Sequence, residues 1–136
     1  MSAPQTPQVS VYSFGYLHDT KVFTWNPQFV VDLRRLFRDP HRDPAFRELT
    51  GHHAAVRARV LGQPGARAFA ASLAATVTAV LPTDDTNAVP VMVALGCAGG
   101  RHRSVVLADT VATHLATQGV RVHIQHLHIN RPVVAR

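Results

Sequence analysis

The feature that most constrains the fold is an apolar segment at residues 89–95, which runs into a glycine-rich segment at 96–100. A short run that is apolar almost throughout is typical of a strand covered on both faces, as at the centre of a parallel sheet. After the glycines, Leu107, Val111 and Leu115 recur at helical spacing. A strand, a tight loop and a helix in this order predict an α/β fold.

Shorter patterns predict the remaining strands. Residues 9–14 alternate with β-branched and aromatic side chains and stop at Gly15, which is typical of a strand. Residues 29–33 form a second apolar run, expected as a buried strand, and residues 120–127 form the last strand. Because strands alternate with helices along the chain, we expect a layered α/β domain with a mostly parallel sheet.

Two further helices are expected between the second strand and the central one. Val56 and Val60 lie one helical turn apart, and the apolar spacing after residue 66 predicts a helix over 67–81, followed by a turn at 82–88. Residues 34–53 show no clear periodicity. Twenty residues without a pattern are long for an idle loop, so this segment is expected to be functional.

The length and composition describe one domain. With 136 residues, the chain is expected to fold as a single domain over residues 9–130, between flexible segments at 1–8 and 131–136. No apolar run reaches the roughly 18–20 residues that a bilayer span needs. The N-terminus lacks the apolar core of a signal peptide. These observations favour a cytoplasmic protein that has no membrane partner.

The excess of arginine would suit an anionic partner, and a genome-wide preference for Arg and Ala codons is the alternative explanation. Lys and Arg together number 14 against 8 Asp and Glu, a formal charge of +6, and Lys21 is the one lysine. Guanidinium groups match phosphate oxygens two at a time. Net charge alone does not distinguish a nucleic acid from a phosphorylated metabolite. A single cysteine excludes a disulfide framework within the chain.

The most informative segment is Gly-Cys-Ala-Gly-Gly-Arg-His-Arg-Ser at residues 96–104. Glycines let backbone N–H groups face one concavity, and a helix start adds unpaired N–H donors. Arg101, His102 and Arg103 would add cationic donors at its mouth, which suits a phosphate. The alternative is a tight turn whose glycines only permit close packing. The segment fits neither a Walker A loop nor a dinucleotide fingerprint.

The same segment also has the spacing of the cysteine-dependent phosphatases. Cys97 and Arg103 are separated by five residues, and Ser104 follows. In those enzymes the thiolate attacks phosphorus while the arginine holds two oxygens. Gly96 stands where they usually carry histidine. An enzyme of this kind is the alternative function, and two carboxylates of the long loop are candidates for its general acid: Asp39 and Asp43.

Four ordered motifs together resemble the C-terminal domain of the RapZ family of RNase adapter proteins. The segment at 96–105 is similar to the family's G-C-T-G-G-(K/R)-H-R-S-V. Ser-Phe-Gly at 13–15, Val-Asp-Leu-Arg at 31–34 with Asp-Pro-His-Arg-Asp-Pro at 39–44, and Thr-Gly at 50–51 follow in the family's order. The resemblance covers nearly the whole chain.

The resemblance implies a fold like a phosphofructokinase-type subdomain and a regulatory, non-catalytic role without a cofactor. It implies a pocket for glucosamine-6-phosphate on the glycine-rich loop, binding of small regulatory RNAs that are presented to ribonuclease E, and homo-oligomers. Carried over by position, the ligand-binding residues would be His41, Cys97, Ala98, Gly99, Gly100, His102, Arg103 and Ser104, with Arg34 and Thr50 as neighbours.

Three departures limit what the resemblance implies. The family's P-loop domain is not part of this sequence, so nucleotide hydrolysis is not carried over, and a separately encoded nucleotide-binding partner is one expectation. Ala98 replaces a threonine whose hydroxyl could donate to phosphate. The basic tail is thinner than in the family, which weakens the case for its RNA-binding candidates: Arg121, His126, His128, Arg131 and Arg136.

The remaining histidines do not predict a metal site. Side chains alternate along a strand, so of the three histidines near the end of the chain only His126 and His128 would share a face. Without a third ligand they are expected to be surface residues, and the same holds for His52 and His53. The role of Trp25, as a lid or an interface anchor, stays open.

Overall fold

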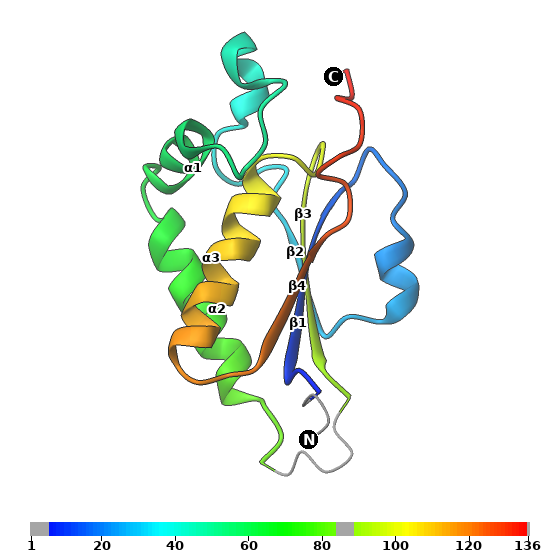
Figure 1. Ribbon diagram of the computed structural model, residues 1–136, viewed down its shortest axis with the longest axis vertical. Coiled ribbons are helices and arrows are strands. Elements are labelled where there is room, and N and C mark those ends of the chain that lie inside the picture. The colour runs from blue at the N-terminus through cyan, green and yellow to red at the C-terminus, as the bar shows by residue number, and fades with distance from the viewer. Residues whose placement is uncertain (1–5, 84–88, 136) are drawn as a thin grey trace, which may run out of the picture.

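The computed structural model describes residues 6–83 and 89–135 and confirms a single α/β domain (Figure 1). Its strands and helices are β1 (Val9–Gly15), β2 (Phe29–Asp32), α1 (Ala54–Leu61), α2 (Ala66–Ala79), β3 (Val91–Cys97), α3 (Arg103–Thr117) and β4 (Val122–His126). Short 3₁₀-helices lie at η1 (Lys21–Trp25), η2 (Pro40–Arg42) and η3 (Pro44–Phe46). Part of the predicted turn at 82–88 lies outside the described residues.

The strands form one parallel sheet in the order β2-β3-β1-β4. Gly15 is paired with Cys97, and Asp32 is paired with Gly96. The carboxyl ends of β1, β2 and β3 therefore meet at one edge of the sheet. Ligands of open parallel sheets bind beyond this edge, and the glycine-rich loop starts there.

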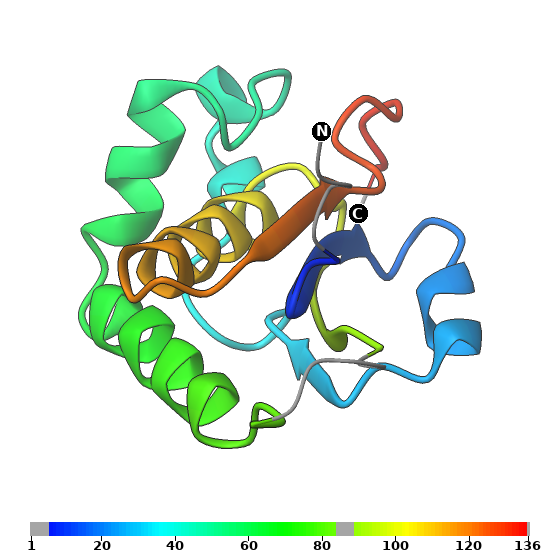
Figure 2. The ribbon, with the colours of Figure 1, turned by 60° about the horizontal axis from the view of Figure 1, so that its bottom comes forward.

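The three α-helices cover one face of the sheet (Figures 1 and 2). α2 turns a row of small side chains, including Ala66, Ala70 and Ala74, into the core, and these are fully buried. Small residues allow α2 to pack closely against α3. On the opposite face, η1 covers a smaller cluster around Phe14 and Val22.

Trp25, whose role the sequence left open, lies on this second face. Its ring is 5.2 Å from that of Tyr12, and the residue is 37% exposed.

β2 differs from the prediction of a buried strand. It lies at an edge of the sheet and pairs with β3 alone. Its residues alternate between half-buried and exposed, with Val30 exposed. The apolar run at 29–33 includes Leu33, which is fully buried but lies after the end of the strand. The run therefore suggested more burial than the strand itself has.

The segment at 34–53 is ordered by two aspartate caps. The side chain of Asp39 accepts a hydrogen bond from the backbone N–H of His41, and that of Asp43 accepts one from Ala45, each at 3.0 Å. Each aspartate precedes a proline that opens a 3₁₀-turn. Aspartate at the cap and proline in the first turn are the residues that such turns favour.

In the parts of the chain that are described, every helix is too short or too polar to cross a membrane.

Candidate anion-binding site

A cavity of about 500 Å³ opens between the loop that follows β2 and the loop that follows β3. Its lining carries four arginines, one histidine and one carboxylate. We call it the cationic cavity, and its residues are Arg34, Asp39, His41, Arg42, Arg47, Ala98 and Arg103. It lies at the carboxyl edge of the parallel sheet, where α/β folds bind their ligands.

Arg103 is the buried arginine among the residues that line the cationic cavity. It is 2% exposed, and its Nη1 atom donates to the carbonyl oxygen of Leu33 at 3.0 Å, with three more carbonyls of residues 34–37 within 3.4 Å. Its Nη2 atom lies 3.2 Å from Asp39. The chain curls around the guanidinium, and Phe37 adopts a left-handed conformation with φ of 58°. These hydrogen bonds offset the strain of that conformation.

The two residues before Arg103 also bind backbone carbonyls. Arg101 donates to the carbonyl oxygens of Glu48, Ile129 and Arg131 at 2.6–3.3 Å. Nε2 of His102 lies 2.9 Å from the carbonyl oxygen of Phe46 and 2.8 Å from that of Leu49, so this nitrogen carries a proton.

This Arg–His–Arg triplet (residues 101–103) therefore departs from the expectation of three cations at the mouth of an anion site. Only Arg103 reaches the cationic cavity. The reason is that the loops around the start of α3 leave carbonyl groups facing inward, and buried carbonyls need donors. The triplet satisfies them and so joins the loops at 33–37 and 46–49 to the tail at 129–131.

Close packing between the loop after β3 and the end of β1 explains why Gly15 and Gly100 are glycines. Gly100 has φ of 72°, and a Cβ atom there would lie 2.8 Å from the backbone nitrogen of Gly15. A Cβ atom on Gly15 would lie 2.5 Å from the carbonyl carbon of Gly99. The loop thus rests directly on the end of β1. This is what the packing interpretation of the glycines predicts.

The thiol of Cys97 lies beneath the loop and is absent from the lining of the cationic cavity. The residue is 2% exposed, and its Sγ atom is 3.1 Å from Oγ of Ser104 and accepts from the N–H of Gly100 at 3.3 Å. Of the two acid candidates, Asp39 is paired with Arg103, and Asp43 lies 3.6 Å from Arg59. Cys97, the nucleophile that the phosphatase alternative would use, is therefore buried and outside the cavity.

The exposed cations of the cavity are positioned by their own contacts. Arg34 forms a bidentate pair with Asp32, with a shortest distance of 2.7 Å, and stacks on the ring of Tyr16 at 3.8 Å. The hydrogen bonds from Arg34 lower the pKa of Asp32. Nε of Arg47 donates to the carbonyl oxygen of His41 at 2.8 Å. The guanidinium groups of Arg34 and Arg47 are thus held at the rim.

Comparison with known families matches residues 7–130 to the RapZ C-terminal domain. The chain belongs to this family. It is 34% identical over 128 residues to a nucleotide-binding protein of Corynebacterium jeikeium, covering 91% of this chain and 42% of that protein.

Two further relatives carry the same description. A nucleotide-binding protein of Streptomyces coelicolor is 36% identical over 132 residues, with 93% of this chain and 42% of that protein covered. A nucleotide-binding protein of Acidithiobacillus ferrooxidans is 43% identical over 99 residues, with 72% of this chain and 33% of that protein covered. The chain spans less than half the length of these relatives.

The ligand-binding residues expected from RapZ fall into two groups. Arg34, His41, Ala98 and Arg103 line the cationic cavity. The others are absent from its lining: Cys97, Gly99, Gly100, His102, Ser104 and Thr50. Oγ of Thr50 instead accepts from the backbone N–H of His52 at 3.2 Å.

Sequence reasoning missed Arg42 and Arg47 as lining residues. Both are exposed side chains of the loop that carries the motif at 39–44. The signal was available in the sequence, because Arg42 lies inside that motif.

The RNA-binding candidates of the tail are less exposed than expected. His128 is 4% exposed, and its Nδ1 atom accepts from the N–H of Gly15 at 2.8 Å, so the prediction of a surface histidine is wrong there. Burial lowers its pKa. The side chain of His126 is 10% exposed and pairs with Asp109. Nε of Arg121 donates to the carbonyl of Thr6. Arg131 is exposed, and Arg136 lies outside the described residues.

Proposed function

We propose that this RapZ C-terminal domain is a regulatory sensor module that binds a phosphorylated amino sugar of the glucosamine-6-phosphate type in the cationic cavity. The observation that carries the proposal is the composition of the cavity, in which four arginines face a single carboxylate, Asp39. That carboxylate is already paired with Arg103. Of the three exposed arginines, Arg34 is paired with Asp32, so Arg42 and Arg47 provide the excess of positive charge for a dianion.

The size and chemistry of the cavity suit a small phosphorylated sugar. A volume of about 500 Å³ lies within the range of small-molecule sites, roughly 300–1,000 Å³. Arg42 and Arg47 offer planar donors for phosphate oxygens. Asp39 offers an acceptor for a sugar hydroxyl or ammonium group. His41 and Ala98 complete the wall.

A sensor also needs a route from the ligand to the rest of the domain. Arg103 provides one, because it joins the cavity residue Asp39 to the carbonyls of residues 33–37. A ligand that draws Arg42 and Arg47 together would tighten the segment that follows Asp39 and so act on its pair with Arg103. A nucleotide-binding region or partner would receive this signal, in keeping with relatives that are described as nucleotide-binding proteins.

RNA binding and self-association stay predictions from the family resemblance. Of the tail residues considered for RNA, Arg131 is the one whose side chain is exposed in the described part of the chain. The anion site is therefore the better supported half of the proposal.

Calorimetry with three probes tests the proposal. Glucosamine-6-phosphate is expected to bind, inorganic phosphate to bind more weakly, and glucosamine not to bind measurably. Affinity for the phosphorylated sugar should fall with added salt, since the contacts are between exposed charges. The proposal is contradicted if glucosamine and glucosamine-6-phosphate bind equally well, or if glucosamine-6-phosphate does not bind.

A further inference from the structure

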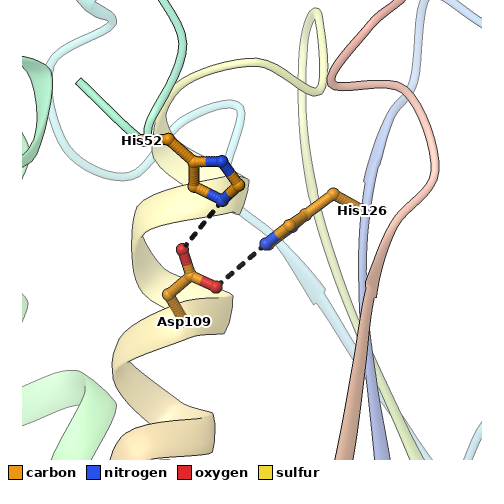
Figure 3. A group of neighbouring side chains, drawn as sticks. All are labelled: His52, Asp109 and His126. Carbon is orange, nitrogen blue, oxygen red and sulfur yellow. Dashed lines mark hydrogen bonds and ion pairs between the residues drawn. The ribbon is translucent and has the colours of Figure 1, made fainter.

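Three potential metal ligands converge at the carboxyl end of β4, which is the outer strand on the other side of the sheet from β2 and the cationic cavity (Figure 3). They are His52, which precedes α1, Asp109 of α3, and His126, the last residue of β4. Their ligand atoms lie within 4.8 Å of one another. Nε2 of His126 is 2.9 Å from Oδ1 of Asp109, and Nε2 of His52 is 3.4 Å from Oδ2. We call this group the His–Asp–His cluster.

The fold brings His52 to the cluster through close packing of the residue before it. The backbone N–H of Gly51 donates to the carbonyl oxygen of Arg101 at 2.7 Å. A Cβ atom on Gly51 would lie 2.7 Å from the side chain of Val105 in α3. The glycine therefore lets the chain lie directly on the helix. This contact places His52 beside α3, near Asp109, which lies one helical turn after Val105.

Ser13 supports His126 from the buried side. Its Oγ atom lies 2.6 Å from Nδ1 of His126, and Ser13 is fully buried. A hydroxyl both donates and accepts hydrogen bonds. It can thus donate to Nδ1 while Nε2–H faces Asp109, and accept from Nδ1–H when Nε2 offers its lone pair to a metal. Second groups of this kind orient the histidines of metal sites.

We propose that the His–Asp–His cluster binds a divalent transition-metal ion such as Zn²⁺. Two imidazoles and one carboxylate are ligands that zinc accepts, and bond lengths of about 2.0–2.2 Å place neighbouring ligand atoms about 3.3 Å apart. The separations of 2.9 Å from His126 to Oδ1 and 3.4 Å from His52 to Oδ2 lie on either side of this value. Imidazole ligands favour such ions over Mg²⁺ or Ca²⁺.

The exposure of the cluster leaves room for the ion and for water. The side chains of His52 and Asp109 are 57% and 31% exposed, while that of His126 is 10% exposed. The ion can therefore enter from solvent, and water completes its coordination. The cluster shares no residue with the cationic cavity. The third ligand could not be predicted from the sequence, because Asp109 is distant in the chain from both histidines and meets them only in the fold.

Titration of the full chain with Zn²⁺, and with Co²⁺ followed by visible absorption, tests the proposal. The expected result is one tight site. His52→Ala and Asp109→Asn should each weaken it by about tenfold or more. Both side chains are partly exposed, so these variants should fold like the parent, which circular dichroism checks. The matched controls are His53→Ala and His123→Ala, because these histidines lie outside the cluster.

The controls separate a built site from general affinity for a chain with nine histidines. Affinity that is unchanged in His53→Ala and His123→Ala supports the proposal. Equal losses in all four variants, or no loss in His52→Ala and Asp109→Asn, overturn it. The absence of saturable binding overturns it as well.

Discussion

Arg103 is a charged side chain that the fold buries almost completely. Burying a charge costs free energy unless the charge is paired and hydrogen-bonded. Asp39 and the carbonyls of residues 33–37 provide this compensation. At the scale of single residues, the stability of the loop beside the cationic cavity therefore depends on one guanidinium group.

Arg103→Ala is expected to lower the free energy of unfolding by about 3 kcal/mol or more, because it removes the cation paired with Asp39 and the donor to several buried carbonyls. Arg42→Ala, which removes an exposed arginine of the same cavity, should change stability by less than about 0.5 kcal/mol. Urea denaturation measures both. Similar losses in the two variants would show that Arg103 has no special structural role.

Two buried histidines make stability depend on pH. Burial lowers the pKa of His102 and of His128 from the usual 6.5. The unfolded chain then binds more protons than the folded chain below about pH 6.5. Their contribution to stability is complete above that pH. It declines as the pH falls from the unfolded-state pKa toward the lower folded-state pKa of each histidine.

His128→Asn is expected to reduce this pH dependence, because the asparagine oxygen can still accept from Gly15 but does not titrate. The free energy of unfolding, measured at about pH 7.5 and about pH 5, gives the slope for each chain. His123→Asn is the control, since His123 is exposed. An unchanged slope in His128→Asn would contradict the assignment.

At the scale of elements, the loop after β3 depends on contact with β1. Gly100→Ala should destabilise the protein for two reasons, a left-handed backbone and a Cβ atom 2.8 Å from the nitrogen of Gly15. Gly65→Ala isolates the first reason, because Gly65 has φ of 84° and nothing within 4 Å of the added atom. We expect Gly65→Ala to lower the free energy of unfolding by about 1 kcal/mol. Gly100→Ala should lower it by roughly 2 kcal/mol more than that.

Thermal denaturation compares the two glycine variants directly. Equal shifts in Tm would mean that the loop moves away from β1 at little cost. The proposed close packing would then be wrong.

Elements with strong local patterns could be predicted from the sequence. The run at 89–95 and the helical repeat after it predicted β3 and α3, and the residues that follow β3 form the loop at the carboxyl edge. β2 was predicted as buried because a short apolar run does not reveal whether its strand has one neighbour or two. The caps at Asp39 and Asp43 were not predicted, although each aspartate stands directly before a proline.

The partners of the Arg–His–Arg triplet could not be predicted in the same way. A guanidinium binds a phosphate oxygen and a carbonyl oxygen with the same donors. Which of them it meets depends on where distant loops leave unpaired carbonyls. Ala98 and Arg103 of the motif at 96–104 line the cavity, but its exposed arginines are Arg34, Arg42 and Arg47.

At the scale of the whole molecule, the start of α3 joins segments from most of the chain. The triplet binds the loops at 33–37 and 46–49 and the tail at 129–131, and the His–Asp–His cluster joins α3 to β4 and to the residue before α1's cap. One edge of the sheet thus carries an excess of exposed arginine around a cavity whose floor is held by buried hydrogen bonds. We predict that this exposed charge, and not the buried triplet, determines anion affinity.

The affinity of Arg42→Gln for glucosamine-6-phosphate, measured by calorimetry beside Arg57→Gln, tests this claim most directly. Both variants remove one exposed arginine, but Arg57 lies on α1 away from the cavity. We expect Arg42→Gln to weaken binding by about tenfold, as for loss of a charge-assisted hydrogen bond, and Arg57→Gln to bind like the parent. Equal affinities in the two variants would contradict the account.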